Sequence, residues 1–393
     1  MRTRWLGLGA LLGLGAAAGL GVSCDDPAAP AFSARRAELL EAVGPSVYRP
    51  AYQRFRDAVG RLEQAVADWD GQPAEASAVR AAFAEAMTAW QGAELFLAGP
   101  AGSSLVYVGG LDLRDSLYSW PTTNPCRVDQ VLADAGYAAT DYLQTSLVNT
   151  VGLDALGHLI HAEDGGNACP ALVTLNSEGT WAALGDAVVF TRRAAFAGVL
   201  VSGLKATADA LLTAWDPAGG DHGGALAAAR GYDGQRDALD QVSWGLLYLD
   251  RQLKDLKLGL PLGLDPDCTT EACPEAVELA WGDLALGAVQ ANLQGARALF
   301  VGEHPGQPDR VGFDAVLRDE GAGDLAEQIL AELDAAQAAA AAVQGPLADA
   351  VVSRRAQVEA LHGAVQALTT TFKTRFVTVL NLTLPQEGAA DND

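Results

Sequence analysis

The chain is organised around the stretch Val151-Gly-Leu-Asp-Ala-Leu-Gly-His-Leu-Ile-His-Ala-Glu163. Its apolar residues Leu153, Leu156 and Ile160 recur at spacings of three and four, which predicts a helix with one apolar face. The glycine pair at 165–166 follows, and glycine commonly ends a helix. We therefore expect a central helix that the rest of the chain surrounds.

The same helix carries three side chains that bind metals. Asp154, His158 and His161 stand at i, i+4 and i+7, within an arc of about 60° at about 100° per residue. Carboxylate and imidazole are ligands of zinc, iron and other divalent ions. Three ligands on one helix make only part of a site, so a second helix would complete it. Alternatively, the histidines hydrogen-bond at the edge of the core. The His-Glu-x-x-His pattern of zinc peptidases is absent from the sequence.

The N-terminus predicts export. Arg2 and Arg4 precede a short apolar run at 5–20, as in a signal peptide, here placed at residues 1–23. Cys24 follows small residues and indicates a bacterial lipobox, although Gly21 replaces the usual leucine. We expect Cys24 to be lipidated and 24–32 to act as a tether, with plain signal-peptidase cleavage as the alternative. No later segment is expected to span a membrane, so attachment would depend on the lipid alone.

The remaining four cysteines indicate disulfides, because an even number in an exported protein commonly pairs. Three connectivities are possible. We expect Cys268 to pair with Cys273 within a loop, and Cys126 to pair with Cys169 near the central helix. A four-thiolate zinc site is the competing interpretation, but the paired Cys-x-x-Cys spacing is missing.

Composition and periodicity predict an all-α fold of two packed four-helix-bundle-like halves. The halves are expected at 33–215 and 235–385, joined by the glycine-rich segment 216–234 and followed by a flexible tail at 386–393. The formal charge of -23 opposes binding to phosphate backbones, so we expect no nucleic-acid partner.

Two helical segments have distinctive patterns. A single long helix is predicted from about residue 177 to Trp215. Charges of both signs predict a helix face that is paired at i, i+4 spacing, at Asp250, Arg251, Lys254, Asp255 and Lys257.

Several motifs together resemble the imelysin-like family of bacterial envelope proteins, over nearly the whole mature chain. In order, they are Trp90 with Glu94, Ser119-Trp-Pro121 followed by Asp129, Gly152-Leu-Asp-Ala-Leu-Gly157, Tyr248-Leu-Asp-Arg-Gln-Leu-Lys-Asp-Leu-Lys-Leu-Gly-Leu-Pro-Leu-Gly263 and Asn292-Leu-Gln-Gly295.

The resemblance implies two helical bundles, a periplasmic or outer-membrane location and a link to iron uptake. Some members of the family are described as metallopeptidases with a Gly-x-His-x-x-Glu motif. In this chain Asp154 stands where that motif has histidine, and Gly157 stands where it has glutamate. By their positions in the family, Glu94 and Asp129 are expected to face the central helix as further metal ligands or, alternatively, as hydrogen-bond acceptors between helices.

These observations give three hypotheses. The first is a non-catalytic envelope lipoprotein, facing the periplasm or the cell surface, that binds a metal ion or a metal-containing ligand in support of iron uptake. Iron and zinc are the expected metals. The second is a metallopeptidase with a non-standard site, because Gly157 cannot act as a general base. The third is a module with a decayed site that binds another envelope protein.

Overall fold

The computed structural model describes residues 32–303 and 311–385. Residues 33–393 belong to one compact unit, and everything described below lies within it. The predicted signal peptide, Cys24 and the tail at 386–393 lie outside the described residues, so those predictions stay open.

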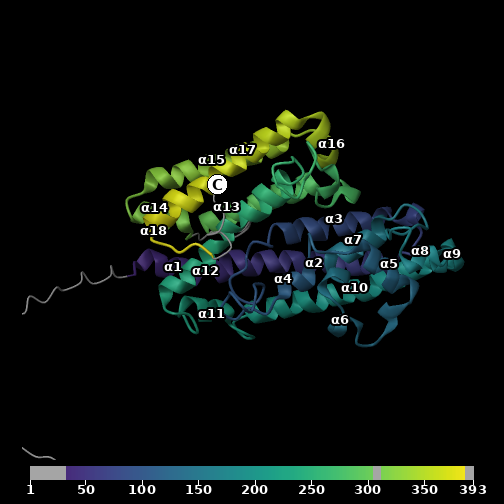
Figure 1. The fold of residues 1–393 in the computed structure, drawn as a ribbon. Helices are drawn as coiled ribbons and strands as arrows, with labels where there is room; N and C mark the ends of the chain where they lie inside the picture. Colours follow the sequence, from purple (N-terminus) through teal and green to yellow (C-terminus); the bar gives the residue numbers. More distant parts are fainter. Residues whose placement is uncertain (1–31, 304–310, 386–393) are drawn as a thin grey trace, which may run out of the picture. The chain divides into compact units, whose positions relative to one another are not determined.

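The first half of the chain is a group of helices around α2 (Figure 1). Its members are α1 (Ala34–Val43), η1 (Gly44–Tyr48), α2 (Arg49–Ala67), α3 (Ser77–Gln91), α4 (Leu113–Leu117), α5 (Pro125–Ala133), α6 (Tyr142–Thr145), α7 (Gly152–His161), α8 (Thr174–Ser177), α9 (Thr180–Leu184) and α10 (Asp186–Trp215). Helix α2 buries Phe55, Val59 and Leu62, the apolar stripe that its sequence predicts, and packs against α3 and α10. The central helix α7 packs against α10 and α3.

The second half is a similar group around α15 and α17. Its members are α12 (Gln235–Tyr248), η5 (Leu249–Gly259), α13 (Ala285–Val301), α14 (Phe313–Asp319), α15 (Gly323–Ala342), α16 (Leu347–Ser353), α17 (Arg355–Thr371), η8 (Phe372–Phe376) and α18 (Val377–Leu380). Helix α11 (His222–Ala227), in the segment that joins the halves, packs against α1 and η1 of the first group. Helix α13 contacts α15 in this half and α3 in the first half, so it joins the two groups. Short 3₁₀ turns complete the described elements: η2 (Pro73–Glu75), η3 (Gly136–Ala138), η4 (Val148–Thr150), η6 (Pro274–Ala276) and η7 (Ala280–Gly282).

The predicted fold class is confirmed. Within residues 32–303 and 311–385 every regular element is a helix or a helical turn, and the helices form two bundle-like groups. Both predicted disulfides are also present, Cys126–Cys169 and Cys268–Cys273.

Two predictions about helices are wrong in detail. The long helix expected from about residue 177 breaks at Gly185, whose φ of 72° favours glycine, so α10 begins at Asp186. The charged segment at 249–259 is a π-helix, η5, although the predicted pairing of charges four residues apart is present between Asp250 and Lys254, at 3.0 Å. Lys254 and Lys257 on η5 are buried, with 2% and 1% of their surface exposed.

Helix α10 is, by length and composition alone, long and apolar enough to cross a membrane, which the sequence analysis did not expect. It packs against α2 and α7, and buries residues such as Phe196, Leu200 and Leu204. A core helix of a bundle meets the same criteria, and these contacts are those of a core helix.

Candidate functional site: the central helix and a buried polar centre

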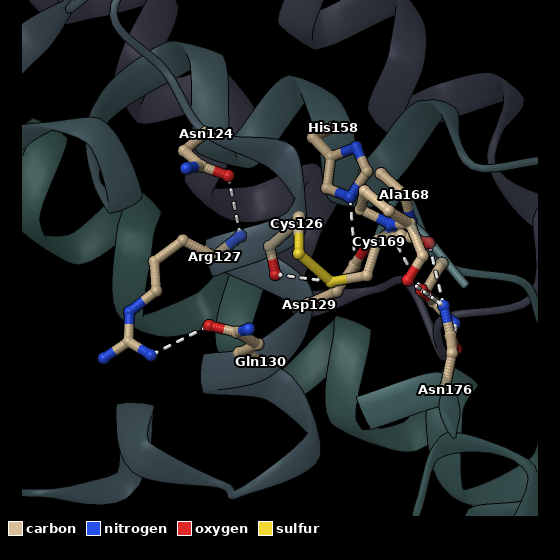
Figure 2. Close-up of a disulfide and its surroundings, with 11 residues drawn as sticks. Asn124, Cys126, Arg127, Asp129, Gln130, His158, Ala168, Cys169 and Asn176 are labelled. Carbon is tan, nitrogen blue, oxygen red and sulfur yellow. Dashed lines mark hydrogen bonds and ion pairs between the residues drawn. A yellow bond between two sulfur atoms is a disulfide. The ribbon is translucent and has the colours of Figure 1, made fainter. Parts of the chain in front are cut away.

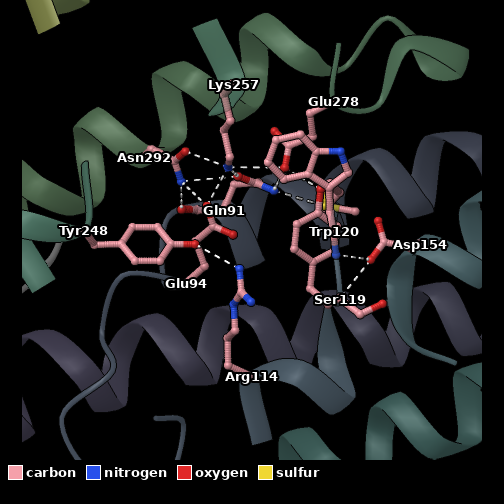
Figure 3. A network of polar contacts seen from close by, with 12 residues as sticks. Gln91, Glu94, Arg114, Ser119, Trp120, Asp154, Tyr248, Lys257, Glu278 and Asn292 are labelled. Carbon is pink, nitrogen blue, oxygen red and sulfur yellow. Dashed lines mark hydrogen bonds and ion pairs between the residues drawn. The ribbon is translucent and has the colours of Figure 1, made fainter. Parts of the chain in front are cut away.

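The central helix α7 places Asp154 under the turn that follows α4. The carboxylate oxygen Oδ2 of Asp154 accepts hydrogen bonds from the backbone N–H groups of Ser119, at 2.8 Å, and Trp120, at 3.0 Å (Figure 3). Asp154 is only 6% exposed. Burial raises its pKa to about 7, although hydrogen bonding from Ser119 opposes the shift. Asp154 therefore fastens the Ser-Trp-Pro turn to α7.

His158 contacts a different carboxylate. Its Nε2 lies 3.0 Å from Oδ1 of Asp129 on α5, which is fully buried. The other oxygen of Asp129 accepts the N–H of Ala168 at 2.7 Å. Ala168 lies beside the Cys126–Cys169 disulfide, so the disulfide holds the loop that supplies this donor (Figure 2). Both carboxylate oxygens of Asp129 are thus engaged by protein groups.

His161 lies among aromatic rings. Its Nδ1 is 3.0 Å from the carbonyl oxygen of Gly157, and its ring packs against Phe83 and Trp281 at centroid distances of 5.4 and 4.3 Å. Burial lowers the pKa of His161 to about 4, so the imidazole is neutral over the ordinary pH range.

The structure pairs Asp129 with His158 but does not bring all five predicted ligands together. Asp154 and His161 face other partners, and Glu94 belongs to the cluster described next. Within the described ranges, 32–303 and 311–385, no three His, Cys, Asp or Glu side chains are grouped so that they could hold a metal ion. Since the acceptor atoms of Asp154 and Asp129 already bind N–H or imidazole groups, the arrangement does not fit a metal held by this set.

Glu94 lies in a buried cluster, here called the polar centre, formed by Gln91, Glu94, Lys257, Glu278 and Asn292 (Figure 3). Nζ of Lys257 lies 2.5 Å from Glu94, 2.6 Å from Gln91 and 2.8 Å from Asn292. It also lies 3.2 Å from Oε1 of Glu278. The polar centre thus joins α3, η5, α13 and the segment that precedes α13.

Three further side chains surround the polar centre. Tyr118 donates a hydrogen bond to Glu278, and Arg114 donates one to the hydroxyl of Tyr248 at 3.2 Å. Burial would lower the pKa of Lys257, but the carboxylates of Glu278 and Glu94 raise it above its ordinary value. Lys257 therefore carries a positive charge in the interior.

The carboxylates of the polar centre are only half satisfied. Oε2 of Glu94 and Oε2 of Glu278 are buried, and neither has a hydrogen-bond partner among the described residues. Buried polar atoms without partners are rare in proteins. Neither Lys257 nor Glu278 was predicted as a site residue: the pattern placed Lys257 on a charge-paired helix face, and Glu278 lies outside any helix, where periodicity gives no signal.

A cleft of about 1200 Å³ lies beside the polar centre, on the outer side of η5. It runs between the 97–115 segment of the first half and η5, α12 and the 264–267 loop of the second half. Asp112, Asp265 and Asp267 line it and form no ion pair with any described residue. Tyr107 and Trp244 also line it, with ring centroids 5.6 Å apart.

A model of the imelysin peptidase family matches residues 48–374. The chain belongs to the imelysin family. The match covers most of the sequence and confirms the resemblance that the motifs indicate. No curated protein matches the sequence.

Two solved structures share the imelysin-like fold. An imelysin-like protein from Psychrobacter arcticum 273-4 aligns with a TM-score of 0.66 and 17% sequence identity, covering 90% of this chain and 98% of that one. A protein of Parabacteroides distasonis ATCC 8503, named as an iron-regulated protein A precursor, aligns with a TM-score of 0.67 and 14% identity, covering 90% and 96%. At these identities the likeness concerns the fold.

Proposed function

We propose that this imelysin-family protein is a non-catalytic lipoprotein of the cell envelope that supports iron uptake by binding a metal-containing ligand. The observation that carries the proposal is the engagement of Asp154, at the position of the family's histidine, by the backbone N–H groups of Ser119 and Trp120.

Hydrolysis by a metal ion requires ligands with an open position and a group that takes a proton from the bound water. Gly157 stands at the position of the family's glutamate and has no such group. A Cβ atom there would lie 2.3 Å from the ring of Trp281, so the space beside α7 is filled. These residues support a structural role for α7.

The link to iron rests on family membership and on the relative named as an iron-regulated protein A precursor. The envelope location rests on that precursor and on the predicted signal peptide and lipobox at Cys24. Lipidation would leave the described domain attached to a membrane surface through its N-terminal tether alone.

The cleft beside η5 suits the ligand better than the interior does. Its volume of about 1200 Å³ exceeds the roughly 300–1000 Å³ of common ligand pockets. Among the described residues that line the cleft, three carboxylates lack an ion pair, Asp112, Asp265 and Asp267, and they outnumber the one cation that lacks an ion pair, Arg251. Electrostatic complementarity therefore favours a ligand that carries positive charge, such as a ferric hydroxamate complex with a free ammonium group.

The test is titration of a soluble form beginning at Asp25 with ferrioxamine B, a ferric trihydroxamate that bears one ammonium group. We expect saturable binding at one site per chain. Arg251→Gln removes from the cleft a positive charge that repels the cationic ligand, so binding should tighten by about 2-fold to 5-fold. The matched control is Arg54→Gln, which removes one exposed cation outside the cleft and should leave affinity unchanged. Absence of saturable binding would refute the proposed ligand.

A further inference from the structure

The polar centre has the ligand set of a cation site. Four side-chain oxygens, from Gln91, Glu94, Glu278 and Asn292, lie within 2.5 to 3.2 Å of Nζ of Lys257. Carboxylate and amide oxygens are the ligands that Mn²⁺ and Ca²⁺ prefer. In this chain the group at their centre is an ammonium.

Because the polar centre is buried, neighbouring protein groups must compensate its charges. The side chains of Lys257, Glu94 and Glu278 are each at most 2% exposed, so solvent screens them little. One ammonium contacts two carboxyl groups, the guanidinium of Arg114 adds a second positive charge near Glu94, and each carboxyl group keeps one oxygen without a partner among the described residues. The cluster therefore keeps two acceptor atoms that the single lysine does not satisfy.

Lys254, the neighbouring lysine on η5, has different ion-pair partners. Nζ of Lys254 lies 3.0 Å from Asp250, but Asp250 also pairs with Lys373 at 2.8 Å. Removing Lys254 would leave Asp250 with a cationic partner, whereas removing Lys257 would leave Glu94 and Glu278 facing no other lysine. The two buried lysines thus form a matched pair for an experiment.

We propose that the ammonium group of Lys257 is the resident cation of the polar centre. It occupies the position among these four oxygens that a divalent metal would otherwise take, so the native polar centre binds no metal ion. Shortening Lys257 then converts the polar centre into a site for a small hard divalent cation. This role of Lys257 does not depend on which ligand the cleft beside η5 binds.

The test titrates wild-type protein, Lys257→Ala and Lys254→Ala with MnCl₂. Electron paramagnetic resonance measures Mn²⁺ binding, and thermal unfolding measures the melting temperature. Lys257→Ala should bind one Mn²⁺ per chain. Its melting temperature should rise by about 5 °C when Mn²⁺ exceeds its Kd by about 100-fold. Wild type and Lys254→Ala should show neither effect.

Two further variants keep the result decisive if Lys257→Ala folds poorly. Lys257→Met/Glu94→Gln/Glu278→Gln lacks the buried charges and should fold without any response to Mn²⁺. Lys257→Ala/Glu94→Gln should lose the Mn²⁺ response. The proposal is overturned if Mn²⁺ changes neither the folded fraction nor the melting temperature of Lys257→Ala. It is also overturned if the wild type binds Mn²⁺ stoichiometrically and Glu94→Gln abolishes that binding.

Discussion

Gly157 lies directly beneath the indole of Trp281: a Cβ atom at residue 157 would lie 2.3 Å from Cη2 of Trp281 and 3.0 Å from Phe83. Gly157→Ala should therefore destabilise the protein by about 1–3 kcal/mol, because the added methyl group overpacks the contact. Urea denaturation measures the change. In a Trp281→Ala background the cost should fall by about 1 kcal/mol or more, since the obstructing ring is gone.

The control for the comparison of Gly157→Ala with and without Trp281 is Gly60→Ala on α2, where no atom lies within 4 Å of the added Cβ. It should stabilise the helix by about 0.5–1 kcal/mol. Equal costs for Gly157→Ala with and without Trp281 would show that the ring is not what excludes a side chain from residue 157.

Asp154 should make stability depend on pH. Its folded-state pKa of about 7 lies above the unfolded value of about 3.9, so the folded protein binds more protons between these values. The contribution of Asp154 to the free energy of unfolding therefore falls as pH rises from about 4 to about 7, by about 4 kcal/mol at most. Asp154→Asn removes this titration, so the variant should gain stability relative to wild type between pH 5 and pH 8. Parallel stability curves for the two proteins would contradict this.

Asp154→Ala should behave differently from Asp154→Asn. An asparagine oxygen still accepts the N–H groups of Ser119 and Trp120, whereas alanine leaves both without their acceptor. Each lost acceptor costs about 1–3 kcal/mol, so alanine should be the less stable variant at every pH. Denaturation of both variants at pH 5 and pH 8 measures the difference. If they are equally stable, the carboxylate does not hold the Ser-Trp-Pro turn.

The two disulfides should contribute unequally to stability. Cys126 and Cys169 are separated by 43 residues and Cys268 and Cys273 by 5. Loop-closure entropy predicts losses of about 4 and about 2 kcal/mol when each pair is replaced by alanine. The larger loss should come with a weakened Asp129–His158 contact, because the first disulfide holds the loop that donates to Asp129. Urea denaturation of both double variants tests the order, which a reversed ranking would contradict.

The account also predicts no metal-dependent peptidase activity. Incubation of an unfolded protein substrate with the purified chain and Zn²⁺ should give no cleavage above that of a chelator-treated sample. Asp154→Ala should behave like the wild type. Zinc-dependent cleavage that disappears in Asp154→Ala would instead support the metallopeptidase hypothesis.

Local sequence patterns predicted the helices well where packing follows a regular period. The apolar residues of α2 and α7 identified both helices, and cysteine count and position predicted both disulfides. Spacing on α7 also showed that Asp154, His158 and His161 share a broad face. It could not show which neighbouring segments supply their partners, and the turn at Ser119, α5 and Trp281 each supply a different one.

The polar centre could not be predicted from periodicity. A π-helix has a wider turn than an α-helix and is rare, so spacing along η5 predicted the Asp250–Lys254 ion pair but not that Lys257 points into the interior. Glu278 reaches the polar centre from a segment without a regular period, and its contact with Gln91 spans 187 residues. Only the tertiary fold brings these groups together.

The most direct test of the central claim is one titration series with ferrioxamine B at pH 7.5, using wild type, Asp154→Asn and Asp265→Asn/Asp267→Asn. The account predicts that Asp154→Asn binds as the wild type does, because α7 is structural. The double variant should bind about 3-fold to 10-fold more weakly, because it loses two carboxylates of the cleft. Loss of binding in Asp154→Asn, with none in the double variant, would place the ligand at the central helix and contradict the account.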